Sequence, residues 1–235
     1  MKIVDFNCLA HTILSCSPKC DNEIRMLWEA SLNEPLEGKL LKPIVVTDSK
    51  PYWRKAIFPE YKAHRKSYID PTFYRIVDIG KTLGYPILAV DGLEADDLAG
   101  LVVMYHKSLP FKDKETLYLL TTDTDWCQLV DDAEDIVWCN FGRHTPRIRR
   151  QQQVIDWAYR RFNILITDPA GVVKLKHQLG DSSDNLPPYL AHDLISLQGQ
   201  GWLNSLSNFG YSINHLMTLV RKHYHDSTSR TRASL

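Results

Sequence analysis

Short apolar segments alternate with amphipathic segments through the first 150 residues of the chain. The apolar segments have the length and composition of strands that are covered on both faces. They lie at Lys2–Phe6, Pro43–Thr47, Pro86–Val90, Thr116–Thr121 and Asp135–Cys139. A helical period appears between them, at Asp21–Leu32, Tyr52–Lys66, Pro71–Leu83, Ala95–His106 and Trp126–Val130. This alternation predicts an α/β fold with a mostly parallel central sheet flanked by helices.

From about residue 150 the pattern becomes helical throughout. We expect helices at Gln151–Arg161, Pro169–Leu179, Tyr189–Gly199 and Ile213–His223. The chain is therefore predicted to consist of an α/β core, residues 1–150, and a helical C-terminal subdomain, residues 151–235. The first residues, MKIVDFNCLA, place an aspartate inside an apolar stretch, which favours a buried strand over a signal peptide.

The composition is that of an ordinary globular protein, with 44% hydrophobic and 24% charged residues. Its apolar runs are far shorter than the ~18 residues needed to cross a bilayer, so no membrane association is expected. The five cysteines are an odd number without a CxxC motif, which argues against a disulfide framework or a zinc site. They indicate a reducing cytoplasm.

The charges balance overall, at 28 basic and 28 acidic residues, but they are segregated along the chain. Residues 50–66 hold six basic residues and one acid, and residues 143–161 hold six arginines and one acid. Residues 91–135 hold twelve acids and three lysines. A metal-dependent enzyme acting on a phosphate polymer needs both kinds of block, the acidic one to hold cations and the basic ones to bind the polymer. The alternative interpretation is that these blocks are only the solvent-exposed faces of helices.

Carboxylates follow four of the predicted strands, at the sheet edge where open α/β sheets bind ligands. Two more stand in the segment GDSSDN, and the full set is Asp5, Asp48, Glu94, Asp96, Asp97, Asp123, Asp125, Asp181 and Asp184. Singly, each could cap a helix or stabilise a turn. Together their repulsion would be costly without cations. Oxygen ligands alone favour Mg²⁺ or Mn²⁺, and two such ions ~3.5–4 Å apart suit phosphodiester cleavage.

Five segments in order resemble the 5′ nuclease superfamily: VDFN, VTDSKPYWRKAIFPEYKAHRK, GLEADDLAG, TTDTDWCQL and GDSSDNLP. That superfamily includes flap endonucleases, the 5′-nuclease domain of bacterial DNA polymerase I and phage 5′–3′ exonucleases. The resemblance covers about residues 1–188. The second segment is most similar to phage-type exonucleases that also degrade RNA in RNA–DNA hybrids.

The resemblance implies a PIN-like 5′ nuclease core and hydrolysis of phosphodiesters near the 5′ end of DNA, as a 5′–3′ exonuclease or a flap endonuclease. Two Mg²⁺ or Mn²⁺ ions would be bound, the first by Asp5, Asp48, Glu94, Asp96 and Asp97, the second by Asp123, Asp125, Asp181 and Asp184. DNA with 5′ ends or flaps is the implied partner, and RNA–DNA hybrid is a further one. We expect a monomer in the cytoplasm of a bacterium or a phage-infected cell.

The resemblance also implies a basic arch helix over the active site, at about residues 50–66. Lys62 and Arg54 would be catalytic, and Lys55, Tyr61, Arg65 and Lys66 would contact nucleic acid. In such a helix, Tyr61 and Arg65 share a face, and an aromatic ring among cations suits a frayed nucleic-acid end. Trp53 and Phe58 are more typical of core positions, while Tyr61 fits either role.

One segment departs from the family pattern. Polymerase-type members carry a glycine-rich hairpin after GDSSDN, but residues 186–199 read LPPYLAHDLISLQG here, with no glycine before Gly199. Glycines let backbone N–H groups approach phosphates closely. We therefore expect duplex binding to depend on side chains, for which the candidates are Arg147, Arg149, Arg150 and Lys174.

Two other enzyme classes share some of these features. A HAD-type phosphatase would explain the strand followed by Asp123-Thr124-Asp125, but it places its nucleophile after the first strand and needs no basic block. A PIN-type ribonuclease shares the acidic sheet edge, yet it is usually shorter and lacks GDSSDN. A non-catalytic nucleic-acid-binding protein would be expected to have lost several of the carboxylates.

Overall fold

A six-stranded sheet lies at the centre of the computed structural model, which describes residues 1–65, 70–140, 147–189 and 192–229. The strand order is β3-β2-β1-β4-β5-β6. Five strands are parallel: β1 (Lys2–Asp5), β2 (Pro43–Val46), β3 (Ile87–Leu88), β4 (Leu117–Leu120) and β5 (Ile136–Asn140). The sixth, β6 (Arg147–Arg149), pairs antiparallel with β5 and was not predicted. The predicted α/β class and mostly parallel sheet are confirmed.

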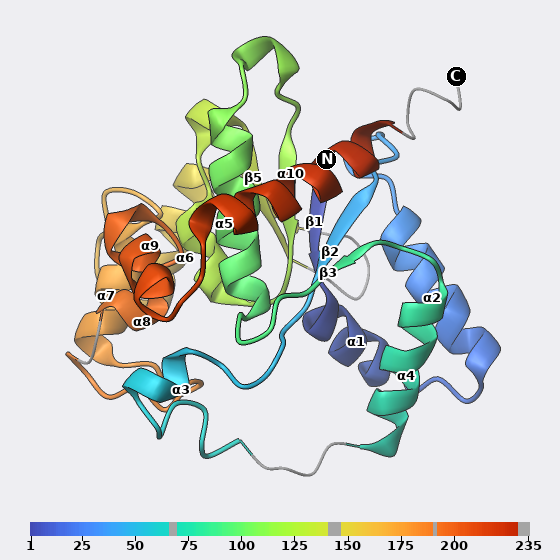
Figure 1. Cartoon of the computed structure of the whole chain (residues 1–235), viewed down its shortest axis with the longest axis horizontal. Coiled ribbons are helices and arrows are strands. Elements are labelled where there is room, and N and C mark those ends of the chain that lie inside the picture. Colours follow the sequence, from blue (N-terminus) through green and yellow to red (C-terminus); the bar gives the residue numbers. More distant parts are fainter. Residues whose placement is uncertain (66–69, 141–146, 190–191, 230–235) are drawn as a thin grey trace.

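Helices cover both faces of the sheet (Figure 1). One face carries α1 (Phe6–Ser15), α2 (Asp21–Asn33) and α4 (Pro71–Thr82), and the other carries α5 (Ala95–Ser108) and α10 (Ile213–Ser229). The remaining helices are α3 (Arg54–Ile57), α6 (Gln151–Phe162), α7 (Gly171–Leu179), α8 (His192–Ile195) and α9 (Gly199–Asn208). The 3₁₀ helices within the described residues are η1 (Phe111–Asp113), η2 (Thr124–Leu129) and η3 (Asp132–Glu134). No described helix is both long and apolar enough to cross a membrane.

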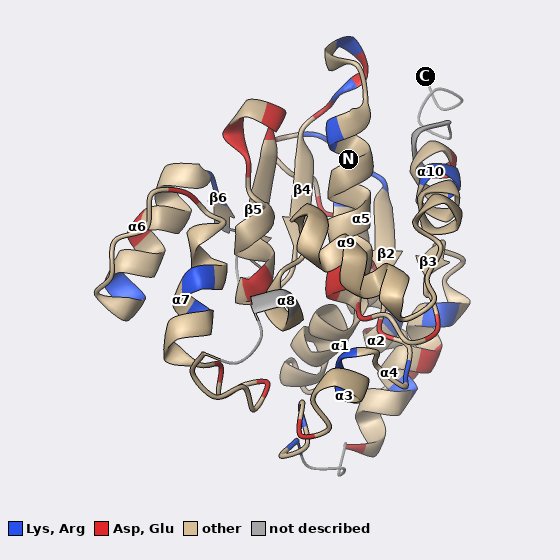
Figure 2. Ribbon diagram, turned by 60° about the vertical axis from the view of Figure 1, so that its left-hand side comes forward, with Lys and Arg blue, Asp and Glu red and all other residues tan. Residues whose placement is uncertain are grey.

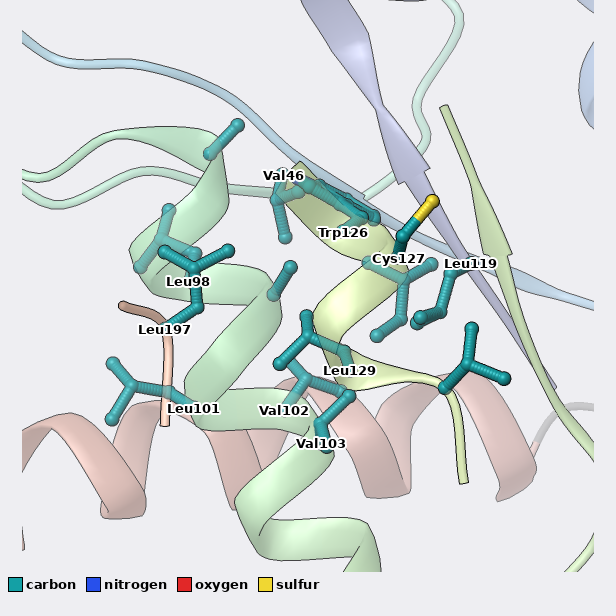
Figure 3. Close-up of a cluster of buried hydrophobic side chains, with 14 of the residues drawn as sticks. Val46, Leu98, Leu101, Val102, Val103, Leu119, Trp126, Cys127, Leu129 and Leu197 are labelled. Carbon is teal, nitrogen blue, oxygen red and sulfur yellow. The ribbon is translucent and has the colours of Figure 1, made fainter. Parts of the chain in front are cut away.

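Buried side chains fix α5 and η2 against each other (Figure 3). Leu98, Leu101 and Val102 of α5 share one apolar cluster with Trp126 and Leu129 of η2, and all five are at most 1% exposed. Burying a side chain of this size contributes roughly 1.5–3 kcal/mol. Because this packing holds the first turn of α5 beside η2, the acidic residues that these two elements carry are held close together.

The helix α1 was missed by the sequence patterns. The Asp5 carboxylate caps it by accepting a hydrogen bond from the Cys8 N–H at 3.0 Å, so the first strand ends at Asp5 and not at Phe6. The helix buries Phe6, Leu9, Ala10 and Ile13, which have the three-and-four spacing of an amphipathic helix.

The predicted arch helix over Tyr52–Lys66 is wrong within the described residues. Only Arg54–Ile57 is helical, and the chain then continues in turns to residue 65. Pro59 explains the end of the helix, because the residue before a proline is driven out of the α region, and Phe58 has φ −133° and ψ 95°. Lys62 has a left-handed backbone with φ 55°. Tyr61, Lys62 and Arg65 therefore do not share a helix face, and Lys66 lies outside the described residues.

Two further predicted helices differ from the structure. The predicted helix Trp126–Val130 is a 3₁₀ helix as far as Leu129, the last residue of η2, and Val130 is extended. The predicted helix Tyr189–Gly199 is reduced, within the described residues, to the four residues of α8, and α9 begins at Gly199. By contrast, α6, α7 and α10 occupy the predicted segments.

Candidate metal centre

Acidic segments lie at the carboxyl ends of the parallel strands, on the side of the sheet that faces α3 and α8, and others lie at the opposite ends, in η1 and η3 (Figure 2). Three residues form the tightest group. Asp96, Asp123 and Asp125 each place a carboxylate oxygen within 4.8 Å of the others. Asp96 lies in the first turn of α5, while Asp123 caps η2 shortly after β4 and Asp125 lies in the first turn of η2. Carboxylates at this spacing can converge on one cation.

Local hydrogen bonds set the orientation of these three side chains. The Asp123 carboxylate caps η2 by accepting the Asp125 N–H at 2.8 Å. The Asp123 N–H donates in turn to Thr121 Oγ1 at 2.9 Å. The indole N–H of Trp126 donates to Asp96 Oδ1 at 2.7 Å. The acidic residues are therefore held in place by the backbone and by the apolar packing of η2.

Burial raises the pKa of all three carboxyl groups, and repulsion by neighbouring carboxylates adds to the effect. The pKa of Asp123 rises to about 7, first because of burial and then because of the charge of Asp125. The pKa of Asp96 is raised well above its ordinary value by burial and by Asp123. A divalent cation would remove this repulsion. The donor set, made of carboxylate oxygens, fits Mg²⁺ or Mn²⁺.

Asp125 is also bound to a lysine that the sequence analysis did not single out. Lys176 Nζ donates both to Asp125 Oδ1 and to Asp181 Oδ2, the latter at 2.8 Å. The other oxygen of Asp181 accepts from the N–H and the hydroxyl of Ser183, at 2.9 and 2.5 Å. Burial alone would raise the pKa of Asp181, but the charge of Lys176 and these hydrogen bonds hold it below its ordinary value.

Asp5 and Asp48 follow neighbouring strands, and protein donors hold both. Asp5 accepts from the Cys8 N–H at 3.0 Å and from Thr121 Oγ1 at 2.9 Å. Asp48 accepts from the Ala95 N–H at 2.8 Å, which caps the start of α5, and from the Tyr52 hydroxyl at 3.2 Å. Burial raises the pKa of both carboxyl groups. Each carboxylate keeps lone pairs that these donors do not use.

Asp97 and Arg54 form a buried ion pair beneath Glu94. The Asp97 oxygens accept five hydrogen bonds: two from Arg54, two from the indole N–H groups of Trp53 and Trp202, and one from the Glu94 N–H. Burial alone would raise the pKa of Asp97, but Arg54 and these donors hold it below its ordinary value. Arg54 also donates to Glu94 Oε2 and to the Leu194 carbonyl oxygen.

The predicted catalytic residue Arg54 is therefore placed in the protein core, at 2% exposure. Four hydrogen bonds engage its guanidinium inside the protein. Trp53, expected in the core, is buried there. The predicted metal ligand Asp97 has its lone pairs occupied by the same network, so the geometry of both residues is that of a structural ion pair.

The residues from Tyr61 to Arg65 reach Glu94 and Asp184. The Tyr61 hydroxyl, expected to fit either the core or nucleic acid, is buried 3.0 Å from Glu94 Oε2 and 2.9 Å from Asp184 Oδ2. Lys62 Nζ donates to Glu94 Oε1 and lies 3.7 Å from Asp184 Oδ2. Arg65 binds Asp184 while its side chain stays 49% exposed. Lys62 and Arg65 therefore bridge the sheet edge and the GDSSDN turn.

The other predicted nucleic-acid contacts are scattered. Lys55 and Lys174 are exposed. The Arg149 guanidinium stacks 4.5 Å from the centre of the Trp138 ring, and Arg150 pairs with Asp135 at 3.0 Å. Arg147 lies on β6. The structure does not bring these residues together with Lys55.

Lys176 could have been found from the helical period of α7. It lies three and four residues after Val173 and Val172, which are both buried, so it belongs to the inner face of the helix. Lys174, the residue that was predicted, is exposed. Thr121 and Trp126 had no sequence feature that marked them as partners of Asp5 and Asp96.

A comparison with known families decides where the chain belongs. Residues 24–158 match the family described as 5′-3′ exonuclease, N-terminal resolvase-like domain. The chain belongs to this family. It is 30% identical over 147 residues to DNA polymerase I of Pseudomonas aeruginosa, covering 61% of this chain and 14% of the polymerase. It is also 30% identical over 188 residues to a 5′-3′ exonuclease of Mycoplasma genitalium, covering 75% of this chain and 60% of that protein.

The chain spans only part of the length of the curated relatives that it matches. It covers 14% of the two DNA polymerases and 50% of a 5′-3′ exonuclease of Buchnera aphidicola.

Solved structures share the fold of this chain. A phage T5 5′-exonuclease with bound zinc superposes with a TM-score of 0.61 at 22% identity, covering 95% of this chain and 87% of that one. A phage T5 flap endonuclease in a pseudo-enzyme–product complex with DNA and metal ions gives a TM-score of 0.57 at 22% identity, with 94% and 86% covered.

Proposed function

We propose that this protein is a metal-dependent 5′–3′ exonuclease and structure-specific 5′ flap endonuclease. The observation that carries the proposal is the convergence of Asp96, Asp123 and Asp125 at the sheet edge of a chain that belongs to the 5′-3′ exonuclease family. The family membership favours neither a PIN-type ribonuclease nor a HAD-type phosphatase.

The proposed cofactors are two Mg²⁺ or Mn²⁺ ions. A first ion would be held around Asp96, with Asp5, Asp48 and Glu94 as nearby carboxylates. A second would be held by Asp123, Asp125, Asp181 and Asp184, and Asp96 could also contact this ion because it lies close to Asp123 and Asp125. When bound, the ions would lower the pKa of the attacking water and stabilise charge on the attacking and leaving oxygens. We assign Asp97 to the support of Glu94, since five donors occupy its oxygens.

Lys62 is the proposed catalytic cation of this site. Its ammonium lies at Glu94 and near Asp184, beside the carboxylates that would hold the ions. There it would contact the phosphate whose charge is displaced in the transition state. Arg54, proposed from the sequence for the same role, is better assigned to positioning Glu94, because its donors bind Glu94 and Asp97.

The exposed cations are the proposed contacts to nucleic acid. Arg65 stands at the edge of the site, and Lys55 and Lys174 are exposed on α3 and α7. Phosphate contacts of this kind position a duplex without reading its sequence. The proposed set also includes Lys66, Arg147, Arg149 and Arg150, whereas Tyr61 is assigned to the core because its ring is buried.

DNA with 5′ ends or flaps is the proposed substrate, and the RNA strand of an RNA–DNA hybrid is a second one. We propose that residues 1–150 form the nuclease core and that residues 151–235 complete the site. Lys176, Asp181 and Asp184 support this division, because they reach the sheet edge from the second part of the chain. The proposed form is a cytoplasmic monomer.

A panel of 5′-labelled substrates tests the proposal: blunt duplex, nicked duplex, 5′ flap and RNA–DNA hybrid. Mg²⁺ should support release of short 5′ products from at least one of them, and excess EDTA should abolish it. Asp123→Asn is the matched loss-of-metal variant. Full activity in EDTA would contradict the proposal, and turnover of p-nitrophenyl phosphate without DNA cleavage would favour the phosphatase alternative.

A further inference from the structure

Lys176 occupies the position between two carboxylates that come from distant parts of the chain. Asp125 lies in η2 after β4, and Asp181 lies after α7 in the GDSSDN segment. The ammonium donates to Asp125 Oδ1 and to Asp181 Oδ2, and the lysine side chain is only 10% exposed. The lysine is thus bound by oxygens that a cation at this site would also use.

The body of α7 fixes Lys176 in this place. Gly171 lets the start of α7 lie against Ile166, since a Cβ at Gly171 would be 2.8 Å from Ile166 Cβ. Val172, Val173 and Leu175 are buried, so the helix cannot turn about its axis without exposing them. Only the flexible lysine side chain is free to leave the two carboxylates.

Hydrogen bonds from Ser183 hold the Asp181 carboxylate so that one of its oxygens is available to a cation. Ser183 binds its Oδ1 through both the backbone N–H and the hydroxyl, which leaves Oδ2 directed to Lys176. Besides Lys176, the carboxylates of Asp181 and Asp184 act on Asp125 and repel it, and those of Asp96 and Asp123 also lie close to it. A single positive charge therefore offsets part of a larger negative charge at this position.

We propose that Lys176 is an internal counter-ion that competes with the second divalent ion. It holds Asp125 and Asp181 in place when that ion is absent, and the ion binds by displacing it. This inference rests on the proposed function, because it needs a second ion at these carboxylates. Its consequence is that the second ion binds the free protein more weakly than the first, since each binding event must also break both lysine contacts.

Titration of the full chain with Mn²⁺ at pH 8, without DNA, tests the inference. Free Mn²⁺ is counted by electron paramagnetic resonance, and the affinities are measured by calorimetry. Lys176→Met should raise the affinity of the weaker site about tenfold or more and leave the tighter site within about twofold, because a unit charge a few ångströms away has an effect of this size. Lys174→Met is the matched control on the exposed face of the same helix, and it should titrate like the unmodified protein.

Thermal unfolding gives a second measurement that does not depend on activity. In EDTA, Lys176→Met should unfold at a lower temperature than the unmodified protein. Saturating Mn²⁺ should raise the unfolding temperature of the variant by more than it raises that of the unmodified protein. If Lys176→Met folds poorly, Lys176→Gln, which keeps a hydrogen-bond donor without the charge, takes its place and should give the same results. A weaker-site affinity that is unchanged or lowered in both variants would overturn the inference. Failure of the unmodified protein to bind any Mn²⁺ would instead overturn the proposed function.

Discussion

The Arg54 guanidinium and the Asp97 carboxylate form a bidentate ion pair inside the protein. Nη2 lies 2.8 Å from Oδ1 and Nη1 lies 2.7 Å from Oδ2, while the two side chains are 2% and 0% exposed. The same guanidinium binds Glu94. The pair therefore joins α3 to the start of α5, where the acidic residues of the candidate site begin.

Removing one partner of this pair should unfold the protein more readily. Arg54→Met leaves the Asp97 charge buried without its counter-ion, and losses of about 3–5 kcal/mol in the free energy of unfolding are typical of such changes. Urea denaturation measures the effect. Lys55→Met, at the exposed neighbouring position, is the control and should change stability by less than about 0.5 kcal/mol. A loss of under 1 kcal/mol for Arg54→Met would contradict the assignment.

The adjacent residues Asp96 and Asp97 should respond differently to the same substitution. Asp96→Asn should keep the fold and lose Mg²⁺-dependent cleavage, because Asp96 belongs to the acidic group with Asp123 and Asp125. Asp97→Asn should lose stability, because Asp97 is the partner of Arg54. Circular dichroism melts and cleavage assays on both variants distinguish the two roles. Equal stability with equal loss of cleavage would place Asp97 among the metal ligands.

Without metal, the free energy of unfolding should depend on pH through Asp123. Burial and the nearby Asp125 raise the pKa of Asp123 to about 7 in the folded protein, above its ordinary value of about 3.9. The folded state therefore binds more protons than the unfolded state between these values, so this group makes the protein less stable as pH rises from about 4 to about 7.

Asp123→Asn isolates this effect. In EDTA, the variant should gain stability relative to the unmodified protein at pH 8 and gain little at pH 4.5, as measured by urea denaturation. A gain of the same size at both pH values would mean that the pKa of Asp123 is not raised. The matched comparison in saturating Mn²⁺ should show no gain at pH 8, because the ion offsets the repulsion that the substitution removes.

Lys62→Ala should lower the single-turnover cleavage rate more than it lowers the affinity for duplex. The ammonium lies at Glu94, whereas duplex binding is spread over many phosphate contacts. Residue 62 has a positive φ, which is unfavourable for alanine and lysine alike because both carry a Cβ. The substitution therefore mainly removes the charge. Rates that are unchanged at saturating DNA, with weaker binding alone, would make Lys62 a docking residue. Lys112→Ala, at an exposed lysine of η1 outside the candidate site, is the control and should change neither quantity.

The sheet and its acidic edge could be predicted because both follow from local patterns. Apolar strands such as Ile44-Val45-Val46 are covered on both faces, and Asp48 follows directly after this strand. The parallel arrangement then brings the strand ends to one edge. The close approach of Asp96, Asp123 and Asp125 is the result.

The remaining features depend on contacts that no local pattern records. The basic segment looked helical because its charges and aromatic residues have helical spacing, but Pro59 ends the helix after one turn. Arg54 looked like a surface cation until its partners Glu94 and Asp97, far along the chain, were known. The helical period of α7 marks Lys176 as a residue of the inner face, but no local pattern shows that its partners are Asp125 and Asp181.

Anomalous diffraction from crystals of the protein soaked in Mn²⁺ tests the central claim most directly. The account predicts a strong manganese peak within coordination distance, about 2.0–2.3 Å, of carboxylate oxygens from Asp96, Asp123 or Asp125. Asp123→Asn crystals soaked in parallel should show a weakened or missing peak. Manganese peaks found only away from these carboxylates would contradict the account. So would the absence of a peak there in crystals whose dissolved protein cleaves DNA.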